Sequence, residues 1–555
     1  MKQPRDSSFW IDTGVRLLPS GADIIGMVAL LTFLVQSALP ATAQVKVIRE
    51  LKHDVSAPMR DVAAAVTAFE GAGEPESDDD FAGTSVQVLP LVDDPAIQRS
   101  TGNKLLATLG LNLLGLGSGF TGPQGTFKFV FAPPDPNAAV GATQVLETVN
   151  LSWAVFDKST GATLLGPVTL ASIWSGFNTS CSASGKSLAD PIVLYDKLAQ
   201  RWMIKIVTLG NPYLTCVAVS TTSDATGSYN RYAFQLPDQG NLTGQKFGLW
   251  PDAYYFAQYT FPNPTTYLGP EACALDRNQM LAGQSATMQC FQVNTTNIYG
   301  MIPSDLDGTN APPAGSPNYF LIQGPAQSNS LYLYRFHVDF AVPANSTFTG
   351  PTIINVAPYT PASADGVVSI PQLGTSQLLD ANGSDLMHRL AYRYFAHAPK
   401  PYESLVLTHS VRIGSGSSRT LGLRWYQLRN LSTSPGIFQQ GTYSPDSTYR
   451  WMGSIAQDKM GDFALGYSVS SATMYPGIRY TGRVPTDPVN TMEAEVTLFN
   501  GSGSQTGGGR WGDYTSVSVD PSDDCTMWYT NEYMAGTGAL NWATRLFSFK
   551  FPSCP

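Results

Sequence analysis

The sequence is poor in charged residues, which make up only 14% of its 555 residues, against roughly a quarter in ordinary soluble domains. It also lacks an excess of basic residues, since 33 Lys and Arg face 42 Asp and Glu and give a formal net charge of -9. Nucleic-acid-binding proteins normally carry a basic surface. The charge balance therefore argues against that class of function.

The usual motifs of metal and nucleotide sites are absent as well. The sequence has five histidines and six cysteines, but no CxxC or HxxxH spacing of the kind that holds zinc. It has no G-x-S-x-G motif of serine hydrolases and no complete G-x-x-x-x-G-K-[ST] phosphate loop. We therefore expect no metal and no nucleotide cofactor.

A long apolar run occurs only near the N-terminus. Basic residues precede an apolar run from Ile24 to Val35, and Ala41-Thr42-Ala43 forms a small-x-small cleavage pattern. As a helix the run would span about 18 Å, short of a hydrocarbon core of about 30 Å, so a membrane anchor is the less favoured alternative. We predict a signal peptide over residues 1–43 and a secreted, extracellular chain, with the cell envelope or the periplasm as alternatives. We expect no membrane span after cleavage.

Six cysteines agree with export, because an even count suggests disulfides in an oxidising compartment. Six cysteines can pair in many ways, and the spacing favours pairs of sequence neighbours. The predicted pairs are Cys181 with Cys216, Cys273 with Cys290, and Cys525 with Cys554.

Residues 44–126 have an uneven composition. They contain a helix-like stretch around Met59 to Phe69, an acidic run from Glu74 to Asp80 and a Gly/Leu-rich stretch from Leu105 to Gly122. We predict a partly ordered N-terminal lead-in. The acidic run could chelate Ca²⁺, but a solvated linker is the preferred interpretation of such a block.

From Phe127 onward the sequence consists of short Val-, Tyr-, Phe- and Thr-rich segments separated by Gly, Pro, Asn and Asp, which predicts an all-β domain. Several segments repeat one unit, in which an apolar strand, an Asp-containing turn and a Trp- or Tyr-bearing strand follow each other. The clearest copies begin at Asp190, Trp451 and Gly512, and weaker ones near Ala138, Trp250, Asn318 and His388. A repeat of about 40 to 60 residues is typical of a β-propeller. We predict a single propeller over residues 127–555 with about seven blades, six or eight being alternatives, and Leu546–Phe551 as an outer strand of its last blade.

Three short segments carry a resemblance to a known group of proteins. They are Pro134–Gly141, Asp190-Pro191 with Arg201-Trp202, and Gly512-Asp513-Tyr514-Thr515. They resemble large secreted bacterial proteins of unassigned function that are classed as sialidase-like or BNR-type propellers, over roughly residues 133–555. The resemblance implies a carbohydrate pocket in which three arginines clamp a carboxylate, with a Tyr/Glu nucleophile pair and an Asp acid. The Asp-box pattern S-x-D-x-G-x-x-W is not present intact, and no Tyr/Glu pair can be assigned.

The first strand of each blade lines the channel of a propeller, so residues at the starts of these strands should converge. The resemblance assigns the arginine clamp to Arg389, Arg450 and Arg510. The acid/base candidates are Asp190, Asp252 and Asp513, and Trp250, Trp451 and Trp511 could stack on sugar rings. The structural alternative is that these residues cap turns, pack between blades or form ion pairs.

These observations predict a protein that binds or hydrolyses an extracellular glycan at the channel mouth. The alternative is a non-catalytic interaction or scaffold protein, and whether the chain is an enzyme stays open; an enzyme would be glycoside hydrolase-like. Asp305–Asn310 has oxygen ligands at alternate positions, as Ca²⁺ loops do, but lacks the later bidentate Glu, so a plain turn is preferred. We expect a monomer that does not bind nucleic acid.

Overall fold

The computed structural model describes residues 44–65, 91–128, 131–183, 188–236, 245–263, 266–295, 298, 300–325, 329–363, 368–381 and 385–555. The predicted signal peptide and the acidic run from Glu74 to Asp80 lie outside the described residues. Among the described residues, no helix is both long enough and apolar enough to cross a membrane.

The dominant element is the antiparallel four-stranded meander, and the described residues form seven of them. Their strands are rich in Val, Ile, Tyr and Phe, and many are buried along their whole length rather than on alternate residues. Such continuous burial means that both faces of a sheet are covered. Each meander must therefore be packed between two others.

The meanders are numbered 1 to 7 in chain order. Meander 1 consists of β7 (Asn137–Val140), β8 (Gln144–Val149), β9 (Ser152–Asp157) and β10 (Thr163–Thr169). Meander 2 consists of β11 (Leu188–Asp196), β12 (Arg201–Thr208), β13 (Leu214–Ser220) and β14 (Tyr229–Gln235). Meander 3 consists of β15 (Lys246–Leu249), β16 (Ala253–Thr260), β17 (Gly269–Asp276) and β18 (Thr287–Gln292), with the short helix α2 (Arg277–Ala282) between its last two strands.

Meanders 4 and 5 share one ten-stranded sheet, because their first strands pair in parallel. Meander 4 consists of β19 (Ile302–Leu306), β20 (Asn318–Gln323), β21 (Ser330–His337) and β22 (Thr347–Asn355). Meander 5 consists of β26 (Leu390–Phe395), β27 (Tyr402–Ile413), β28 (Thr420–Arg429) and β29 (Gly436–Tyr443).

The last two meanders complete the series. Meander 6 consists of β30 (Tyr449–Gln457), β31 (Phe463–Ser471), β32 (Met474–Arg483) and β33 (Val496–Phe499). Meander 7 takes only three strands from the C-terminal segment, namely β34 (Ser516–Val519), β35 (Met527–Met534) and β36 (Trp542–Lys550).

Strands from the N-terminal segment complete or extend four of the sheets. β4 (Thr108–Gly117) pairs with β36 and supplies the outer strand of meander 7, so the segment predicted as outer, Leu546–Phe551, lies instead in the third position. β1 (Lys46–Arg49) adds to meander 3, β2 (Lys52–Val55) to meander 2, and β3 (Ile97–Gln98) to meander 5. The helix α1 (Met59–Ala65) follows β2. Residues before Phe127 are thus part of the sheets, a contribution that the expected boundary at residue 127 did not include.

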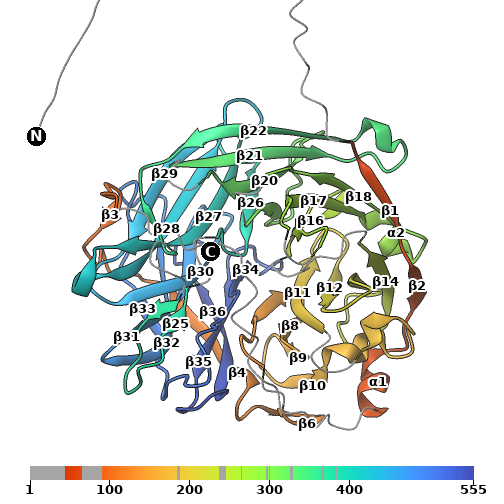
Figure 1. Cartoon of the computed structure of the whole chain (residues 1–555), viewed down its shortest axis with the longest axis horizontal. Helices are drawn as coiled ribbons and strands as arrows, with labels where there is room; N and C mark the ends of the chain where they lie inside the picture. The colour runs from red at the N-terminus through yellow and green to blue at the C-terminus, as the bar shows by residue number, and fades with distance from the viewer. Residues whose placement is uncertain are drawn as a thin grey trace, which may run out of the picture. The chain divides into compact units, whose positions relative to one another are not determined.

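The meanders are arranged in a ring, with their first strands toward the centre and their last strands at the rim (Figure 1). Side chains on the first strands link neighbours: the Val193 N–H donates to Asn137, the Leu249 N–H to Asp305 and the Val517 N–H to Ser454. The Ala138 N–H donates to the Ser516 hydroxyl at 2.9 Å, which joins meander 7 to meander 1 and closes the ring. The chain is therefore an all-β propeller. If each meander is counted as a blade, the described residues form seven, and the predicted number of blades stays a prediction.

Three disulfides are present, and they are the predicted pairs: Cys181–Cys216, Cys273–Cys290 and Cys525–Cys554. The Cys273–Cys290 pair crosses between β17 and β18, where the two residues face each other in register. Because disulfides persist in oxidising compartments, this set fits an extracellular or periplasmic protein.

Candidate functional site

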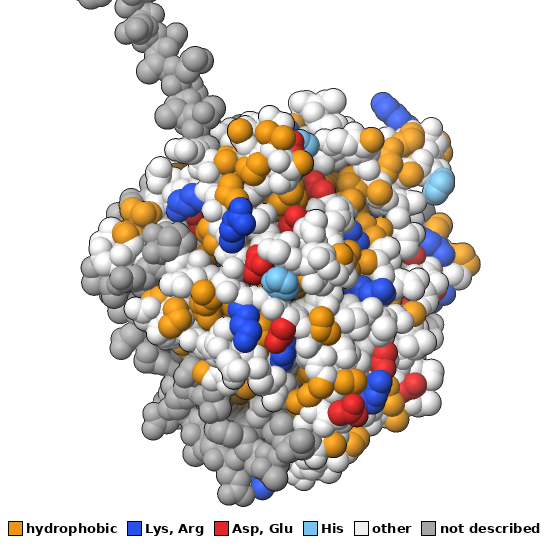
Figure 2. Space-filling model, turned by 90° about the vertical axis from the view of Figure 1, so that its right-hand side faces the viewer, with side chains coloured by type: hydrophobic (Ala, Val, Ile, Leu, Met, Phe, Trp, Pro, Cys, Tyr) orange, Lys and Arg blue, Asp and Glu red, His pale blue; other side chains and the backbone are white. Residues whose placement is uncertain are grey.

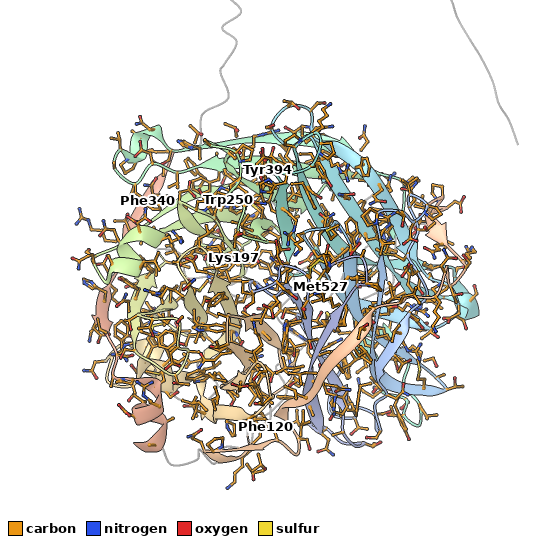
Figure 3. The ribbon with its side chains drawn as sticks, turned by 180° about the vertical axis from the view of Figure 1, so that it is seen from behind. Phe120, Lys197, Trp250, Phe340, Tyr394 and Met527 are labelled. Carbon is orange, nitrogen blue, oxygen red and sulfur yellow. A yellow bond between two sulfur atoms is a disulfide. The ribbon has the colours of Figure 1, made fainter. Side chains whose placement is uncertain are left out.

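The site lies in the central channel, which has two mouths. We call the end where the first strands begin the N-side mouth, and the end where they finish the C-side mouth. A cavity in this channel is lined by residues of meanders 1, 2, 4, 5 and 7, including His388 and Arg389 deep in the channel and Lys197 near the C-side mouth. It leaves about 30 Å³ accessible to water, room for about two water molecules. The channel is therefore nearly filled by side chains, and in Figure 3 Lys197 lies toward the centre of the ring while Phe120 and Phe340 lie at its rim.

The three arginines of the expected clamp all form ion pairs within the protein. Each is held by carboxylates of the protein itself: Arg389 by Asp305 and Asp307, Arg450 by Asp446 and Glu495, and Arg510 by Asp513. Arg389 lines the channel cavity, and the residues that line it include neither Arg450 nor Arg510. The structural alternative, ion pairing, therefore describes these arginines better than an arginine clamp.

The three tryptophans are packed inside the protein. Trp250, Trp451 and Trp511 are each no more than 1% exposed. Trp250 makes an edge contact with the Tyr392 ring at 4.6 Å, and Trp451 lies 5.8 Å from Trp511 between ring centroids. Because their faces are covered by protein, no sugar ring can stack on them in this conformation.

Two of the expected channel residues lie at the opposite mouth. The sequence placed a blade start near Trp250, but β15 ends at Leu249, so Trp250 and Asp252 lie in the following turn on the C-side. Burial raises the pKa of Asp252 to about 6, and the Tyr255 hydroxyl donates to it at 3.4 Å. The predicted blade start was displaced from the observed one because β15 is only four residues long. The aromatic run that follows it forms the second strand of meander 3, not the first.

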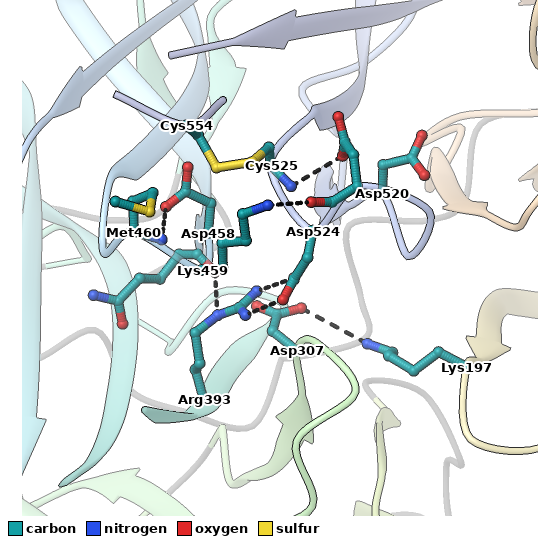
Figure 4. Close-up of polar contacts among 12 residues, drawn as sticks. Lys197, Asp307, Arg393, Asp458, Lys459, Met460, Asp520, Asp524, Cys525 and Cys554 are labelled. Carbon is teal, nitrogen blue, oxygen red and sulfur yellow. Dashed lines mark hydrogen bonds and ion pairs between the residues drawn. A yellow bond between two sulfur atoms is a disulfide. The ribbon is translucent and has the colours of Figure 1, made fainter. Parts of the chain in front are cut away.

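A chain of ion pairs occupies the C-side of the channel, and Figure 4 shows its pair of Lys197 with Asp307. Arg389 binds Asp305 at 2.6 Å and Asp307 at 2.7 Å, and Lys197 lies 3.9 Å from the same Asp307. Burial lowers the pKa of Lys197, and the charges of Asp307 and Asp305 oppose this shift. Since Asp305 and Asp307 are both bound to Arg389, the Asp305–Asn310 segment serves as an ion-pair partner rather than as an open Ca²⁺ loop.

The N-side mouth gathers ionisable groups from four meanders that are not neutralised in this way. We call this set the N-side cluster; its members are Lys205, Lys246, Asp385, His388 and Tyr514. The Lys246 ammonium lies 4.2 Å from the centre of the Tyr514 ring, and the His388 ring lies 6.1 Å from that ring. Within the described part of the chain, no carboxylate comes within ion-pair distance of Lys246. Lys246 is 7% exposed, so its charge is held near the surface of the mouth without an ion-pair partner among these residues.

His388 is neutral and has an open hydrogen-bonding position. It is 2% exposed, and in the described structure its Nδ1 atom has no hydrogen-bond partner. Burial lowers the pKa of His388 well below its ordinary value, and the positive charges of Lys246, Arg389 and Lys205 lower it further. At neutral pH its ring can therefore exchange hydrogen bonds with a ligand without carrying charge.

Asp385 is the carboxyl group of the N-side cluster. The Tyr259 hydroxyl donates to Asp385 Oδ2 at 2.7 Å. Burial raises the pKa of Asp385, the charge of Asp513 raises it further, and Tyr259 and Lys246 oppose the shift. Gly300, with a φ of +75°, lies against it, since an added Cβ atom would come within 2.7 Å of the carboxyl carbon. The backbone is thus shaped to leave room for Asp385.

Lys205 lies behind the mouth and is completely buried. It projects from β12 and donates to the backbone carbonyl of Asp190 at 2.9 Å. Burial lowers the pKa of Lys205 to about 7, and Lys246 lowers it further while Asp190 opposes the shift. Of the predicted acid/base residues, Asp190 and Asp513 therefore lie next to this cluster and Asp252 does not.

The backbone is also unusual at this mouth. Asp135, Asp190, Met452 and Asp513 have φ values of 48°, 54°, 49° and 71°. For residues other than glycine such a conformation costs about 1–3 kcal/mol and persists only when the surroundings enforce it. It recurs just before or early in the first strands of four meanders, so it is a feature of how these strands enter the ring.

Most of the N-side cluster was missed by the sequence interpretation. His388 was placed at a strand start, but Lys205, Lys246 and Asp385 were not singled out. A signal existed for Lys205, because a lysine within the apolar strand Trp202–Val207 must be buried. No such sequence signal existed for Lys246, because it follows a polar loop, as an ordinary surface lysine does.

Two groups of potential metal ligands are present among the described residues, and each contains a disulfide. Glu271 lies beside Cys273–Cys290, and Asp458 lies beside Cys525–Cys554. Because oxidised cysteines offer no thiolate, neither group is a thiolate metal centre.

Comparison with known proteins assigns no family to this chain. No protein family and no curated protein matches the sequence. Similar solved structures include a protein of unknown function from Dyadobacter fermentans, with 9% identity over 80% of this chain and 99% of that one and a TM-score of 0.37. An α-L-arabinanase from Penicillium chrysogenum, solved with arabinobiose, has 8% identity over 80% of this chain and all of that one, with a TM-score of 0.36. An apocarotenoid oxygenase from Synechocystis has 10% identity over 66% and 74%, with a TM-score of 0.36. TM-scores this low assign neither an activity nor a substrate to this chain.

Proposed function

We propose that this protein is a secreted propeller that binds an extracellular glycan at the N-side mouth, and that the glycan carries a carboxylate. The observation that supports this most directly is Lys246, whose ammonium lies on the Tyr514 ring with no carboxylate of the described structure paired to it. The three disulfides support export.

The chemistry of the N-side cluster suits an acidic sugar. A lysine attracts a carboxylate as a point charge. The neutral His388 and the Asp385 carboxyl can exchange hydrogen bonds with hydroxyl groups. In this proposal the anion-binding role expected for Arg389, Arg450 and Arg510 belongs to Lys246, because those three arginines already bind protein carboxylates.

The test is an array of acidic and neutral glycans probed with the chain from Gln44 to Pro555. We expect binding to acidic glycans, and we expect Lys246→Met to weaken it about tenfold to a hundredfold, as loss of a hydrogen bond to a charged group does. Lys400→Met removes the same charge from an exposed surface site and should bind like the parent. Absence of acidic glycans among the ligands, or unchanged binding by Lys246→Met, would refute the proposal.

Hydrolysis of the bound glycan is a second candidate, and one observation favours it. Asp385 has a raised pKa while the nearby Asp513 is held by Arg510 at 2.6 Å. Two carboxyl groups in such different surroundings are what acid/base catalysis requires. Asp385 would act as the acid and Asp513 as the base.

A hydrolysis screen separates the two candidates. If the protein is an enzyme, Asp385→Asn should abolish turnover. Asp252→Asn changes another buried carboxyl with a raised pKa, but at the C-side mouth, and should leave turnover unchanged. Binding without turnover in the parent chain would refute the proposal that the protein is a hydrolase and support the proposal that it only binds the glycan.

A further inference from the structure

Two aspartates occupy the turn between β30 and β31, far from the N-side mouth. Asp458 and Asp462 are both completely buried. Asp458 Oδ1 accepts the backbone N–H groups of Met460, Gly461 and Asp462 at 2.8, 2.9 and 3.0 Å, the first of which is drawn in Figure 4. Asp462 Oδ2 accepts the hydroxyl of Ser553 from the C-terminal segment. Each carboxyl group thus has one oxygen satisfied by the protein.

The other oxygen of each carboxyl group has no such partner. Among the described residues, Asp458 Oδ2 and Asp462 Oδ1 are buried without a donor, and no Lys, Arg or His lies within ion-pair distance of either group. The two side chains become hydrogen-bond partners when one of them carries a proton. Two like charges so close together in a buried site cannot both ionise readily.

We propose that Asp458 and Asp462 share one proton, and that this proton stabilises the contact between the C-terminal segment 551–555 and meander 6. The stability of that contact would then depend on pH. Ser553 of this segment donates to Asp462, and the Cys525–Cys554 disulfide lies within 4.8 Å of a carboxylate oxygen of Asp458. Loss of the proton leaves two buried negative charges facing each other. The repulsion between them destabilises the turn to which the C-terminal segment is bound through Ser553.

The charged groups around the pair do not neutralise it. Arg393 faces Asp458, but its guanidinium is bound to Asp524 through two hydrogen bonds of 2.7 Å. The Lys459 ammonium points to the backbone carbonyl of Asp523.

Acidic neighbours add to the negative charge. Asp487 raises the pKa of Asp462, and Glu493 interacts with Asp462 as well. On the side of the C-terminus, the Pro555 oxygen lies 3.7 Å from Cys525 Sγ, a disulfide sulfur that has no proton to donate. The surroundings therefore favour retention of the shared proton.

The sign of the pH effect follows from these surroundings. Burial raises the pKa of Asp458 to about 8, and the charge of Asp462 adds to the shift; burial likewise raises the pKa of Asp462. Because the pKa of the folded state exceeds that of the unfolded chain, the stabilisation is complete below about pH 4 and is lost as the pH rises through about 8.

The test compares melting temperatures of three chains across this range. Asp462→Asn keeps a hydrogen bond to Asp458, because the amide can donate, but removes the shared proton. Asp157→Asn is the matched control: Asp157 also precedes a Lys and caps its turn through Ser159 and Thr160, but it is only partly buried and has no carboxyl partner among the described residues. We expect the melting temperature of the parent and of Asp157→Asn to fall between about pH 5 and about pH 9, and that of Asp462→Asn to fall less.

An infrared measurement keeps the proposal testable if Asp462→Asn is unstable. The parent at neutral pH should show the carbonyl band of a protonated carboxyl group, and Asp458→Asn should have a weaker band. Identical pH profiles for the parent and Asp462→Asn, or an unchanged band, would overturn the proposal. So would a calcium-dependent rise in the melting temperature of the parent that Asp462→Asn lacks, since the pair would then hold a cation.

Discussion

Arg424 is completely buried in meander 5, and its charge is balanced by a residue from the distant N-terminal segment. Its guanidinium donates to Asp94 at 2.9 Å and lies over the rings of Tyr359 and Tyr426. Asp94 also accepts the Thr442 hydroxyl at 2.7 Å. A buried charge pair of this kind adds little net stability but is costly to break, because the remaining charge stays buried.

Asp94→Ala should therefore destabilise the protein by about 3–5 kcal/mol, measured as the free energy of unfolding in urea. The control is Arg60→Ala, which breaks an ion pair with Asp224 whose two side chains are 56% and 42% exposed. That change should cost less than about 1 kcal/mol. Equal losses in the two variants would contradict this account of Arg424.

At the residue scale the sequence predicted some pairings and not others. The disulfides were predictable because each joins cysteines close in sequence, at separations of 35, 17 and 29 residues. The ion pairs were not, because Arg389 and Asp305 are 84 residues apart and Arg424 and Asp94 are 330 apart. No local pattern marks which carboxylate a distant arginine will meet.

The outer strands of the sheets divide into two kinds. β4 has buried residues facing the interior, and Leu546 and Phe547 of β36, which pair with it, are almost fully buried. β1 and β2 are half-exposed along their length and only extend sheets that already have four strands. Loss of β4 should expose an apolar edge, whereas loss of β1 and β2 should not.

Truncated chains test this difference. A chain beginning at Phe127 should fail to melt cooperatively, because meander 7 then lacks its outer strand and the apolar residues of β36 that pair with it are exposed. A chain beginning at Leu91 keeps β3 and β4, and we expect it to fold with a lower melting temperature than the chain beginning at Gln44. Thermal unfolding followed by circular dichroism would decide, and a cooperative, parent-like transition for the chain from Phe127 would count against the role of β4.

At the element scale, repeats were predictable where they carry a polar turn between two apolar strands. Copies beginning at Asp190, Trp451 and Gly512 correspond to the first strands of meanders 2, 6 and 7. The first strands of meanders 3 and 4 were missed because β15 and β19 have only four and five residues. β2 was missed because its sequence, Lys-His-Asp-Val, has three polar residues of four.

The whole molecule is a ring whose two channel mouths differ in charge balance. The C-side holds arginine and lysine matched by aspartates, whereas Lys246 at the N-side is unmatched within the described residues. On the face shown in Figure 2, acidic and basic side chains are interspersed and form no large field of one sign. Attraction of an anion would therefore be local to the mouth and not a property of that surface.

The fold class was predictable from the whole sequence, since strand length, turn residues and repeat spacing all indicate a propeller. The site was predictable only in part. Asp190, His388 and Asp513 lie near the starts of first strands, but side-chain burial decides which groups at such positions can meet a ligand. Burial depends on packing between blades, which no single repeat reveals.

The central claim is that the N-side mouth binds a carboxylate of a glycan through Lys246. Titration calorimetry with a galacturonic acid oligosaccharide and with its methyl ester tests it directly, because esterification removes the charge and little else. We predict that the chain from Gln44 binds the acid about tenfold or more tightly than the ester, and that Lys246→Met binds the two equally. Equal affinities in the parent chain, or a preference for the acid that survives in Lys246→Met, would contradict the account.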